Sequence, residues 1–444
     1  MSDLPTVVIG AGPQGLAAAA HLLERSERPL VFEAGDGPGF AVGQWAHVRL
    51  FSAWPELVDP AAARLLEPTG WAAPVDGYPT GGEWIASYLA PLAATLGERV
   101  RYRTRVTGVS RRGRDRLVSA GRAEQPFTVH ISGPDGVESR VQARAVIDAS
   151  GTWAQPNPAG ADGLPARGER AAAAAGVLSY LPPTPERAAA VAGKHTVIVG
   201  SGHSAMTAIV DLAETARVNP GSRLTWVLRR GAVGDTFGGG TADELPQRGA
   251  LGVRARAAVE DGLVDLVTGF RVEQIEQTDA GVVVASEGGR ELPAADHVVV
   301  LTGFRPDLSF LSEMRLDLDP VLQAPVRLAA KIDPNVHSCG SVPPHGAREL
   351  AQPEPDLYLV GMKSYGRAPT FLARTGYEQV RSVVAELAGD HEAAARVQLR
   401  LPETGVCGGT GLFDDPTGAA AGGCCGTAAP GPQLVTLTGV SPQA

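Results

Sequence analysis

Two stretches of this chain share one pattern, in which a β-branched run breaks into closely spaced glycines and continues as a segment rich in small and apolar residues. The first stretch spans residues 6–24 and the second spans residues 196–213. A β-branched run of this length favours a strand, and the segment after it has helical periodicity. The sequence therefore predicts two strand–turn–helix units about 190 residues apart, and an α/β chain of more than one domain.

Glycines stand where the first turn needs them. In Gly10-x-Gly12-x-x-Gly15, the first glycine permits a tight turn, the second lets the backbone approach a pyrophosphate, and the third lets the helix pack closely on the strand. Glu33 ends the next apolar run, 23 residues after Gly10, where a carboxylate can accept hydrogen bonds from a ribose diol. Strand, glycine turn, helix and acid together predict a dinucleotide site, with an ordinary turn as the alternative.

The second turn differs in the charge that follows it. Gly200 and Gly202 are kept, and Ala205 in the third position is small enough for close packing of the helix. The next strand-like run ends in Arg229 and Arg230 instead of an acid. A guanidinium can bind a 2′-phosphate, which a carboxylate would repel, and such a charge-assisted hydrogen bond contributes about 1.5 to 3 kcal/mol. This favours NADPH over NADH, and the alternative is two solvated surface arginines.

Other apolar runs indicate how the two units are organised. Runs at 144–151 and 296–303 end in small residues and are predicted as strands that close the first and the second unit. A further strand is predicted over 357–361, and helices over 82–96 and 371–387. Two dinucleotide sites of different polarity in one chain suggest one bound flavin, FAD, and one diffusing nicotinamide cofactor, NADPH.

The predicted fold class is α/β, with two Rossmann-like dinucleotide-binding domains, the second inserted in the first. The FAD-binding domain comprises residues 1–160 and 331–400, and the NADPH-binding domain comprises residues 161–330. The segment 162–194, rich in Ala, Pro and Arg, is expected to cross between them. Residues 401–444 carry only three charged side chains, which predicts a flexible Gly-rich, Cys-containing tail.

Several motifs carry a family resemblance over residues 1 to about 390. Gly43-Gln44-Trp45 follows the first unit, and the second unit returns through Thr302-Gly303-Phe304-Arg305-Pro306-Asp307. With the two glycine turns, these make the chain resemble NADPH-dependent, FAD-containing monooxygenases, the class that includes flavin-containing and Baeyer–Villiger monooxygenases. Segments 48–54, 79–81 and 361–372 look most like flavoproteins of bacterial arsenic-resistance clusters. The class signature Phe-x-Gly-x-x-x-His is missing from 162–194, and Val48 stands where an Asn is usual.

The resemblance implies an oxidoreductase in which NADPH reduces FAD, and a C4a-(hydro)peroxyflavin then oxygenates a small soft nucleophile, such as an arsenical, sulfur or nitrogen compound. The residues expected to hold FAD are Gly10, Gly12, Pro13, Gln14, Gly15, Glu33, Ala34, Gln44, Trp45, Arg49, Val106, Ala149, Gly151, Gly361 and Phe371. Those expected to hold NADPH are Gly200, Ser201, Gly202, His203, Ser204, Arg229, Arg230, Thr302 and Gly303.

Oxygenation requires a hydrogen-bond donor or a cation near the flavin edge and a site that excludes water. Arg49, four residues beyond Trp45, is the first candidate for this catalytic role. His47 and His203 are the next candidates. For each of the three, a structural role is the alternative.

The cysteines support a competing interpretation. The chain has no cysteine before Cys339, which speaks against an ordinary disulfide reductase with a dithiol at the flavin. Cys424 and Cys425, however, resemble the C-terminal dithiols of some thioredoxin and mercuric reductases, and with Cys407 they offer thiolates to a soft metal. The alternatives are therefore a reductase that passes electrons to these thiols or to a metal, a soft-metal-binding flavoprotein without turnover, and an inert tail.

The charge and composition of the chain disfavour some classes of binding partner. A net charge of −9 disfavours nucleic acid and anionic membranes, and no apolar run reaches the length of a membrane span. We expect a cytoplasmic enzyme that acts on a small molecule and O2. The oligomeric state is left open.

Overall fold

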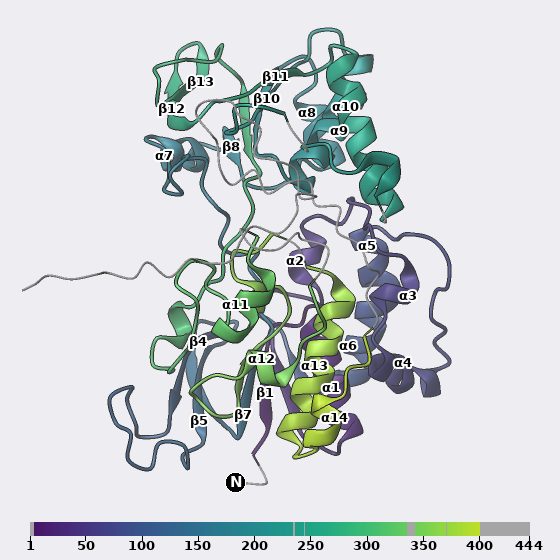
Figure 1. Cartoon of the computed structure of the whole chain (residues 1–444), viewed down its shortest axis with the longest axis vertical. Helices are drawn as coiled ribbons and strands as arrows, with labels where there is room; N and C mark the ends of the chain where they lie inside the picture. The colour runs from purple at the N-terminus through teal and green to yellow at the C-terminus, as the bar shows by residue number, and fades with distance from the viewer. Residues whose placement is uncertain (1–3, 234–235, 244, 335–341, 370, 400–444) are drawn as a thin grey trace, which may run out of the picture.

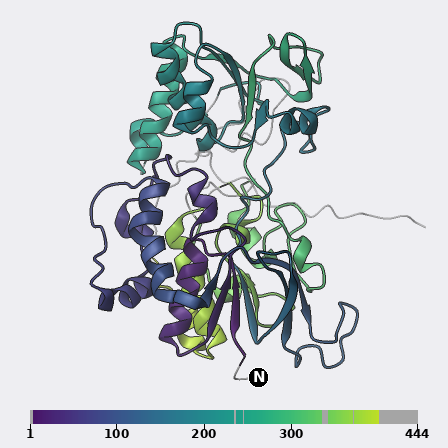
Figure 2. The same ribbon diagram turned by 180° about the vertical axis from the view of Figure 1, so that it is seen from behind.

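The computed structural model describes residues 4–233, 236–243, 245–334, 342–369 and 371–399. Two lobes lie one above the other in Figure 1, and the chain passes between them more than once. Each lobe is built on its own parallel sheet of five strands. The view from behind in Figure 2 shows the same division. Within the described residues, no helix is long and apolar enough to cross a membrane.

The sheet of the lower lobe joins strands from distant parts of the sequence. Its order is β15 (Leu357–Leu359), β7 (Ala145–Asp148), β1 (Thr6–Ile9), β2 (Pro29–Phe32) and β3 (Val100–Arg101). All neighbours in it are parallel. The glycine turn follows the central strand β1, so it lies at the carboxyl edge of the sheet, where open α/β sheets bind their ligands.

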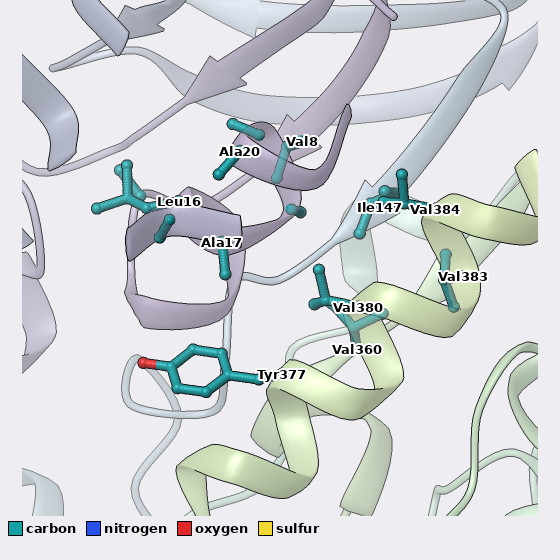
Figure 3. Close-up of a cluster of buried hydrophobic side chains, with 14 of the residues drawn as sticks. Val8, Leu16, Ala17, Ala20, Ile147, Val360, Tyr377, Val380, Val383 and Val384 are labelled. Carbon is teal, nitrogen blue, oxygen red and sulfur yellow. The ribbon is translucent and has the colours of Figure 1, made fainter. Parts of the chain in front are cut away.

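Alternation along β1 and β7 distributes apolar side chains to both faces of this sheet. Val8 and Ile147 pack on one side against α1 (Pro13–Glu24) and α13 (Ala373–Leu387). Figure 3 shows Val8 and Ile147 with Val380 and Val384 of α13 in this cluster. Val7 and Val146 face the other side, where they pack against an antiparallel sheet. That sheet consists of β4 (Arg105–Arg111), β5 (Phe127–Ser132) and β6 (Glu138–Ala143).

Short helices complete the lower lobe. They are α2 (Phe40–Gly43), α3 (Trp54–Leu57), α4 (Pro60–Leu66), α5 (Gly81–Trp84), α6 (Ala90–Leu96), α11 (Val326–Ile332), α12 (Ala347–Leu350) and α14 (His391–Ala395). A π-helical turn, Ile85–Leu89, joins α5 to α6, so the helix predicted over 82–96 forms with one irregular turn. The helix predicted over 371–387 is α13 and begins at Ala373.

The upper lobe repeats the plan. Its parallel sheet has the order β11 (Asp265–Val267), β10 (Arg223–Val227), β9 (His195–Val199), β14 (His297–Val300) and β8 (Leu178–Ser179). Helices α8 (Pro185–Ala190), α9 (His203–Val218) and α10 (Pro246–Glu260) pack on one face. Helix α7 (Glu169–Ala174) and the hairpin of β12 (Val272–Thr278) and β13 (Gly281–Ser286) pack on the other.

The predicted α/β fold class with two Rossmann-like sheets is confirmed. One detail is different. The segment 162–194, expected to cross between the domains, instead forms α7, β8 and α8 of the upper lobe. Ala172 of α7, Leu178 of β8 and Ala188 of α8 are buried in the cores of that lobe. The tail 401–444 lies outside the described residues.

Candidate functional site

The first glycine turn has the backbone that its sequence predicts. Gly10 has φ +99°, a conformation that favours glycine. Its N–H donates to the carbonyl of Phe32 at 2.7 Å. A Cβ on Gly15 would lie 1.9 Å from the carbonyl oxygen of Gly10, so helix α1 approaches the strand as closely as a glycine allows. A Cβ on Gly12 would meet nothing within 4 Å, which leaves room for a ligand at that point.

Helix α1 presents its positive end to this space. Gly12 is its N-cap in an extended conformation, no side chain caps the helix, and Pro13 is its first residue. The first backbone N–H groups of a helix have no partner within the helix and attract anions. The open space at Gly12 therefore fits a pyrophosphate, as the sequence predicts for FAD. Gln14 points toward α13, where its amide donates to the carbonyl of Ala373 at 3.4 Å.

Glu33 lies beside the same turn. Its Oε2 accepts from the N–H of Ala11 and its Oε1 from the N–H of Gly35, both at 2.7 Å. These two bonds fix the orientation of the Glu33 carboxyl group. Each oxygen keeps a further lone pair for a donor such as a ribose hydroxyl. Glu33 is thus placed and oriented as the prediction requires for a residue that accepts hydrogen bonds from a ribose diol. The neighbouring Ala34 is exposed.

The end of β7 holds a buried ion pair that sequence reasoning missed. Asp148 is fully buried, and Lys363 is 1% exposed with its Nζ 3.3 Å from Asp148 Oδ2. The Lys363 ammonium also donates to Ser150 Oγ at 2.9 Å and to the carbonyl of Asp307 at 2.6 Å. Lys363 therefore ties the segments around Ala149 and Gly151 to the chain that returns from the upper lobe.

The other residues predicted to hold FAD belong to the lower lobe but differ in their surroundings. Gly361 donates its N–H to Gln379 Oε1 at 2.7 Å, and Phe371 lies edge-on to Tyr365 with ring centroids 5.0 Å apart. Trp45 packs against Gly81, where a Cβ would come within 2.9 Å of its ring. Val106 is buried in the core between the two lower sheets.

The catalytic candidates lie on or beside the segment that faces the upper lobe. The Arg49 guanidinium is more than half exposed, donates to the carbonyl of Tyr78 and lies 3.9 Å from Glu83. His47 Nε2 is buried without a hydrogen-bond partner within the described residues. His203 begins helix α9, and Phe51 of the lower lobe lies edge-on to its ring at a centroid distance of 5.2 Å.

His203 stands in an environment that disfavours the charged imidazole. Loss of hydration in the surrounding protein lowers the pKa of His203, and the positive charge of Arg248 lowers it further. Because the residue keeps more than a third of its surface exposed, we expect solvent to limit this decrease. The structure therefore favours a neutral His203 near pH 7. The three candidates belong to one region, but their catalytic roles stay predictions.

The second glycine turn has the same form. Gly200 has φ +135°, and a Cβ there would lie 2.2 Å from the carbonyl oxygen of Leu301. A Cβ on Gly202 would meet nothing within 4 Å, and Gly202 is the uncapped N-cap of α9. The turn and the first turn of α9 are open to solvent at Ser201, Gly202, His203 and Ser204. A pyrophosphate therefore fits here as well.

The predicted arginines lie at the end of β10. Arg229 is exposed and donates from Nη1 to the carbonyl of Ala161 at 3.2 Å, and Arg230 is half-buried. On the other side of the turn, Thr302 Oγ1 donates to the carbonyl of Asn157 at 2.8 Å, and Gly303 is exposed. The Arg229 side chain can reach solvent, as a residue that receives a 2′-phosphate must.

The thiol ligands predicted for a soft metal cannot be placed. Cys407, Cys424 and Cys425 lie outside the described residues, as does Cys339. In the part of the chain that the structure describes, no group of three His, Cys, Asp or Glu side chains could hold a metal ion.

Comparison with known proteins identifies the family of this chain. The family model of the pyridine nucleotide-disulphide oxidoreductases matches residues 7–327. No curated protein sequence matches the chain at a significant level. The structure is similar to a bacillithiol disulfide reductase from Bacillus cereus, with 19% identity, a TM-score of 0.65, and coverage of 87% of this chain and 99% of that one.

Two solved monooxygenase-type structures are also similar. A flavin-containing monooxygenase from Stenotrophomonas maltophilia has 23% identity and a TM-score of 0.53, and the match covers 87% of this chain and 100% of that one. An ornithine hydroxylase from Pseudomonas aeruginosa has 16% identity and a TM-score of 0.60, with 87% and 99% covered. At these identities the likeness establishes the fold.

The family match covers well over half of the chain and includes both glycine turns. The predicted resemblance to two-dinucleotide flavoproteins is confirmed, as is the prediction of an oxidoreductase that uses FAD and NADPH. The narrower resemblance to arsenic-resistance flavoproteins stays a prediction. The chain belongs to the pyridine nucleotide-disulphide oxidoreductase family.

Proposed function

We propose that the protein is an NADPH-dependent FAD monooxygenase that oxygenates a small soft nucleophile, such as a sulfur, nitrogen or arsenic compound, with O2 as co-substrate. The observation that carries this proposal is the distribution of cysteines. No cysteine precedes Cys339, so neither glycine turn, nor the end of β7, nor the Gln44-Trp45 segment offers a thiol to the flavin. An ordinary disulfide reductase has its thiol pair beside the flavin, whereas a monooxygenase does not need one.

Each region of the site has a role in this proposal. FAD, when bound, supplies the redox chemistry with NADPH and O2. Glu33 and the amino end of α1 bind and orient FAD, and Arg229 selects the phosphorylated nicotinamide cofactor. Trp45 and Phe371, both half-buried against the core of the lower lobe, help to exclude water. Arg49 is our candidate for the cation that oxygenation requires.

Stoichiometry tests the proposal. The purified holoenzyme is supplied with NADPH, O2 and, in turn, a thioether, a tertiary amine and a trivalent organoarsenical. We expect one of these nucleophiles to make NADPH and O2 disappear in equal amounts, and isotopically labelled O2 to place one labelled oxygen in the product. Consumption of NADPH without oxygen transfer to any nucleophile would contradict the proposal.

The cysteine pair in the tail supports a second candidate function. Cys424 and Cys425 are adjacent, and a reductase that passes electrons from the flavin to them would work without O2. Anaerobic turnover of NADPH with a disulfide or with mercuric ion distinguishes this reductase from a monooxygenase. A variant with both cysteines changed to serine keeps monooxygenase activity and loses reductase activity. A protein that only binds soft metal shows neither activity.

We also propose that the lower lobe is the FAD-binding domain and the upper lobe the NADPH-binding domain. The predicted first boundary, at residue 160, lies close to the point where the chain leaves the lower lobe. The predicted second boundary, at residue 330, lies beyond the point where the chain returns from β14 over 301–307, because Leu311, Met314 and Leu328 are buried in the lower lobe. The strand order supports this division, because β15 pairs with β7 in the sheet of the lower lobe. Limited proteolysis that cuts within residues 152–157 and 301–307 would test it.

A further inference from the structure

The chain crosses between the lobes along two segments that are bonded to each other. Residues 152–157 lead out from β7, and residues 301–307 return from β14. The N–H of Asn157 donates to the carbonyl of Gly303, and the N–H of Arg305 donates to the carbonyl of Gln155, both at 2.9 Å. The two crossings thus form a short antiparallel ribbon, and any rotation of one lobe against the other must bend it.

Side chains strengthen one end of this ribbon. Asn157 Nδ2 donates to the carbonyl of Thr302 at 3.1 Å, and Arg305 Nε donates to Asn157 Oδ1 at 2.8 Å. Arg305 also donates from Nη2 to the carbonyl of Gly163 at 3.1 Å. These bonds fix the ribbon to the start of the upper lobe.

A stacked aromatic pair holds the other end. Trp153 lies on the outgoing crossing and Phe304 on the returning one, with ring centroids 4.5 Å apart and an interplanar angle of 26°. Stacked aromatic pairs contribute interaction energy beyond that expected from the area that they bury, and they favour a few relative orientations of the two rings. Both residues are only half-buried, so they are not part of the described hydrophobic cores of either lobe.

The pair is connected to the residues beside the flavin site. The indole N–H of Trp153 donates to Gln44 Oε1 at 3.0 Å. Gln44 follows helix α2 and precedes Trp45, in the segment that we expect to lie along the flavin. Gln44, Trp153 and Phe304 therefore link the flavin segment with both crossings, although they are far apart in sequence.

We propose that Trp153 is a positioning residue for hydride transfer, which sets the orientation of the NADPH-binding lobe relative to the flavin through its bond to Gln44 and its stacking on Phe304. In that step a hydride passes from NADPH to FAD, giving NADP+ and FADH−. The step requires donor and acceptor atoms within about 3 to 3.5 Å, and a misplacement of about 1 Å costs on the order of 100-fold. This inference rests on the two cofactors and is independent of whether the enzyme is a monooxygenase or a reductase.

Anaerobic rapid mixing of the holoenzyme with NADPH tests the proposal. W153F keeps an aromatic ring for stacking and removes the indole N–H, and we expect it to slow flavin reduction roughly 2- to 10-fold, the loss of about one hydrogen bond. W153A removes both contacts, and we expect a loss of about 10- to 100-fold. FAD content and reduction by dithionite, which needs no nicotinamide, should stay as in the wild type.

Controls separate positioning from a structural role. Trp71 also donates its indole N–H to a carbonyl, that of Ser87 at 2.8 Å, but it packs against the core of the lower lobe and has no bond to either crossing segment among those described. W71F should leave flavin reduction unchanged. Q44L should slow reduction at least as much as W153F does, because Gln44 is also expected to contact FAD. The double variant should be no slower than Q44L, because both changes break the same hydrogen bond.

Two results would overturn the proposal. The first is flavin reduction by NADPH at the wild-type rate in both W153F and W153A. The second is a loss of FAD or of thermal stability in W153F that matches the loss of rate, since this would make Trp153 merely structural.

Discussion

In the lower lobe the strand after the glycine turn leads to Glu33, and in the upper lobe the corresponding strand leads to Arg229. The carboxylate of Glu33 is held by two backbone N–H groups at 2.7 Å, whereas Arg229 is exposed and makes one bond of 3.2 Å to a carbonyl. A side chain that is already held in one orientation loses little conformational entropy on binding a ligand, whereas an exposed arginine side chain loses more. The difference suggests a first site that retains its nucleotide and a second site that exchanges it.

The two turns also differ in the residue at the third position of the glycine motif. Gly15 has no room for a methyl group, because a Cβ there would lie 1.9 Å from the carbonyl oxygen of Gly10. In the second turn Ala205 occupies this position and is fully buried. Helix α9 thus leaves space for a side chain that α1 excludes.

We expect the largest effect from G15A. The added methyl group collides with backbone, so α1 must move away from β1, and FAD binding and folding should both fail. FAD content and the thermal melting temperature of the purified protein measure this. The matched variant A205G in the upper lobe should cost no more than about 1 kcal/mol. If G15A retained FAD and stability, the close approach of α1 would be wrong.

The next effect concerns Glu33. E33A removes the acceptor for the ribose diol and leaves the N–H groups of Ala11 and Gly35 without their partner. Hydrogen bonds to a charged group contribute about 1.5 to 3 kcal/mol, so FAD affinity should fall roughly 10- to 100-fold. Equilibrium dialysis of FAD measures the change, and an unchanged affinity would show that Glu33 does not contact the nucleotide.

A smaller effect is expected for R229A in the second site. The exposed guanidinium is our candidate partner of the 2′-phosphate, and its loss should raise the KM for NADPH about tenfold or more. The KM for NADH should change little, since NADH has no such phosphate. Steady-state kinetics with both cofactors make the comparison. An equal change for NADPH and NADH would assign Arg229 a structural role.

The smallest effect is expected between the two lobes, at Arg49. Its guanidinium is bonded to the Tyr78 carbonyl and lies near Glu83 on the surface, so R49A should leave FAD bound. If Arg49 assists oxygenation, release of H2O2 per NADPH should rise a few-fold. A peroxide assay with FAD content as the control measures this, and unchanged coupling would remove Arg49 from the mechanism.

Local patterns in the sequence predict much of this site. The two turns, Glu33 and Arg229 follow from glycine spacing and from the residues that end the next strands, because these signals lie within about 35 residues. The buried pair of Lys363 and Asp148 has no such signal, because it joins residues more than 200 positions apart.

The crossings show the same limit. The sequence places the outgoing crossing in 162–194, a segment rich in Pro and Ala, but the chain leaves the lower lobe over 152–157. The return over 301–307 agrees with the segment 302–307 predicted for it. The stacking of Trp153 on Phe304 depends on how the two lobes meet, which no short pattern encodes. The positions of His47 and Arg49 likewise depend on a segment without regular helix or strand.

The central claim is that one chain retains FAD in the lower lobe and exchanges NADPH in the upper lobe. Anaerobic titration of the purified holoenzyme with NADPH, followed by the flavin absorbance, tests it most directly. We predict one tightly bound FAD per chain, bleached by an equimolar amount of NADPH and much more slowly by the same amount of NADH. A purified protein without flavin, or a flavin that NADPH does not reduce, would contradict the account.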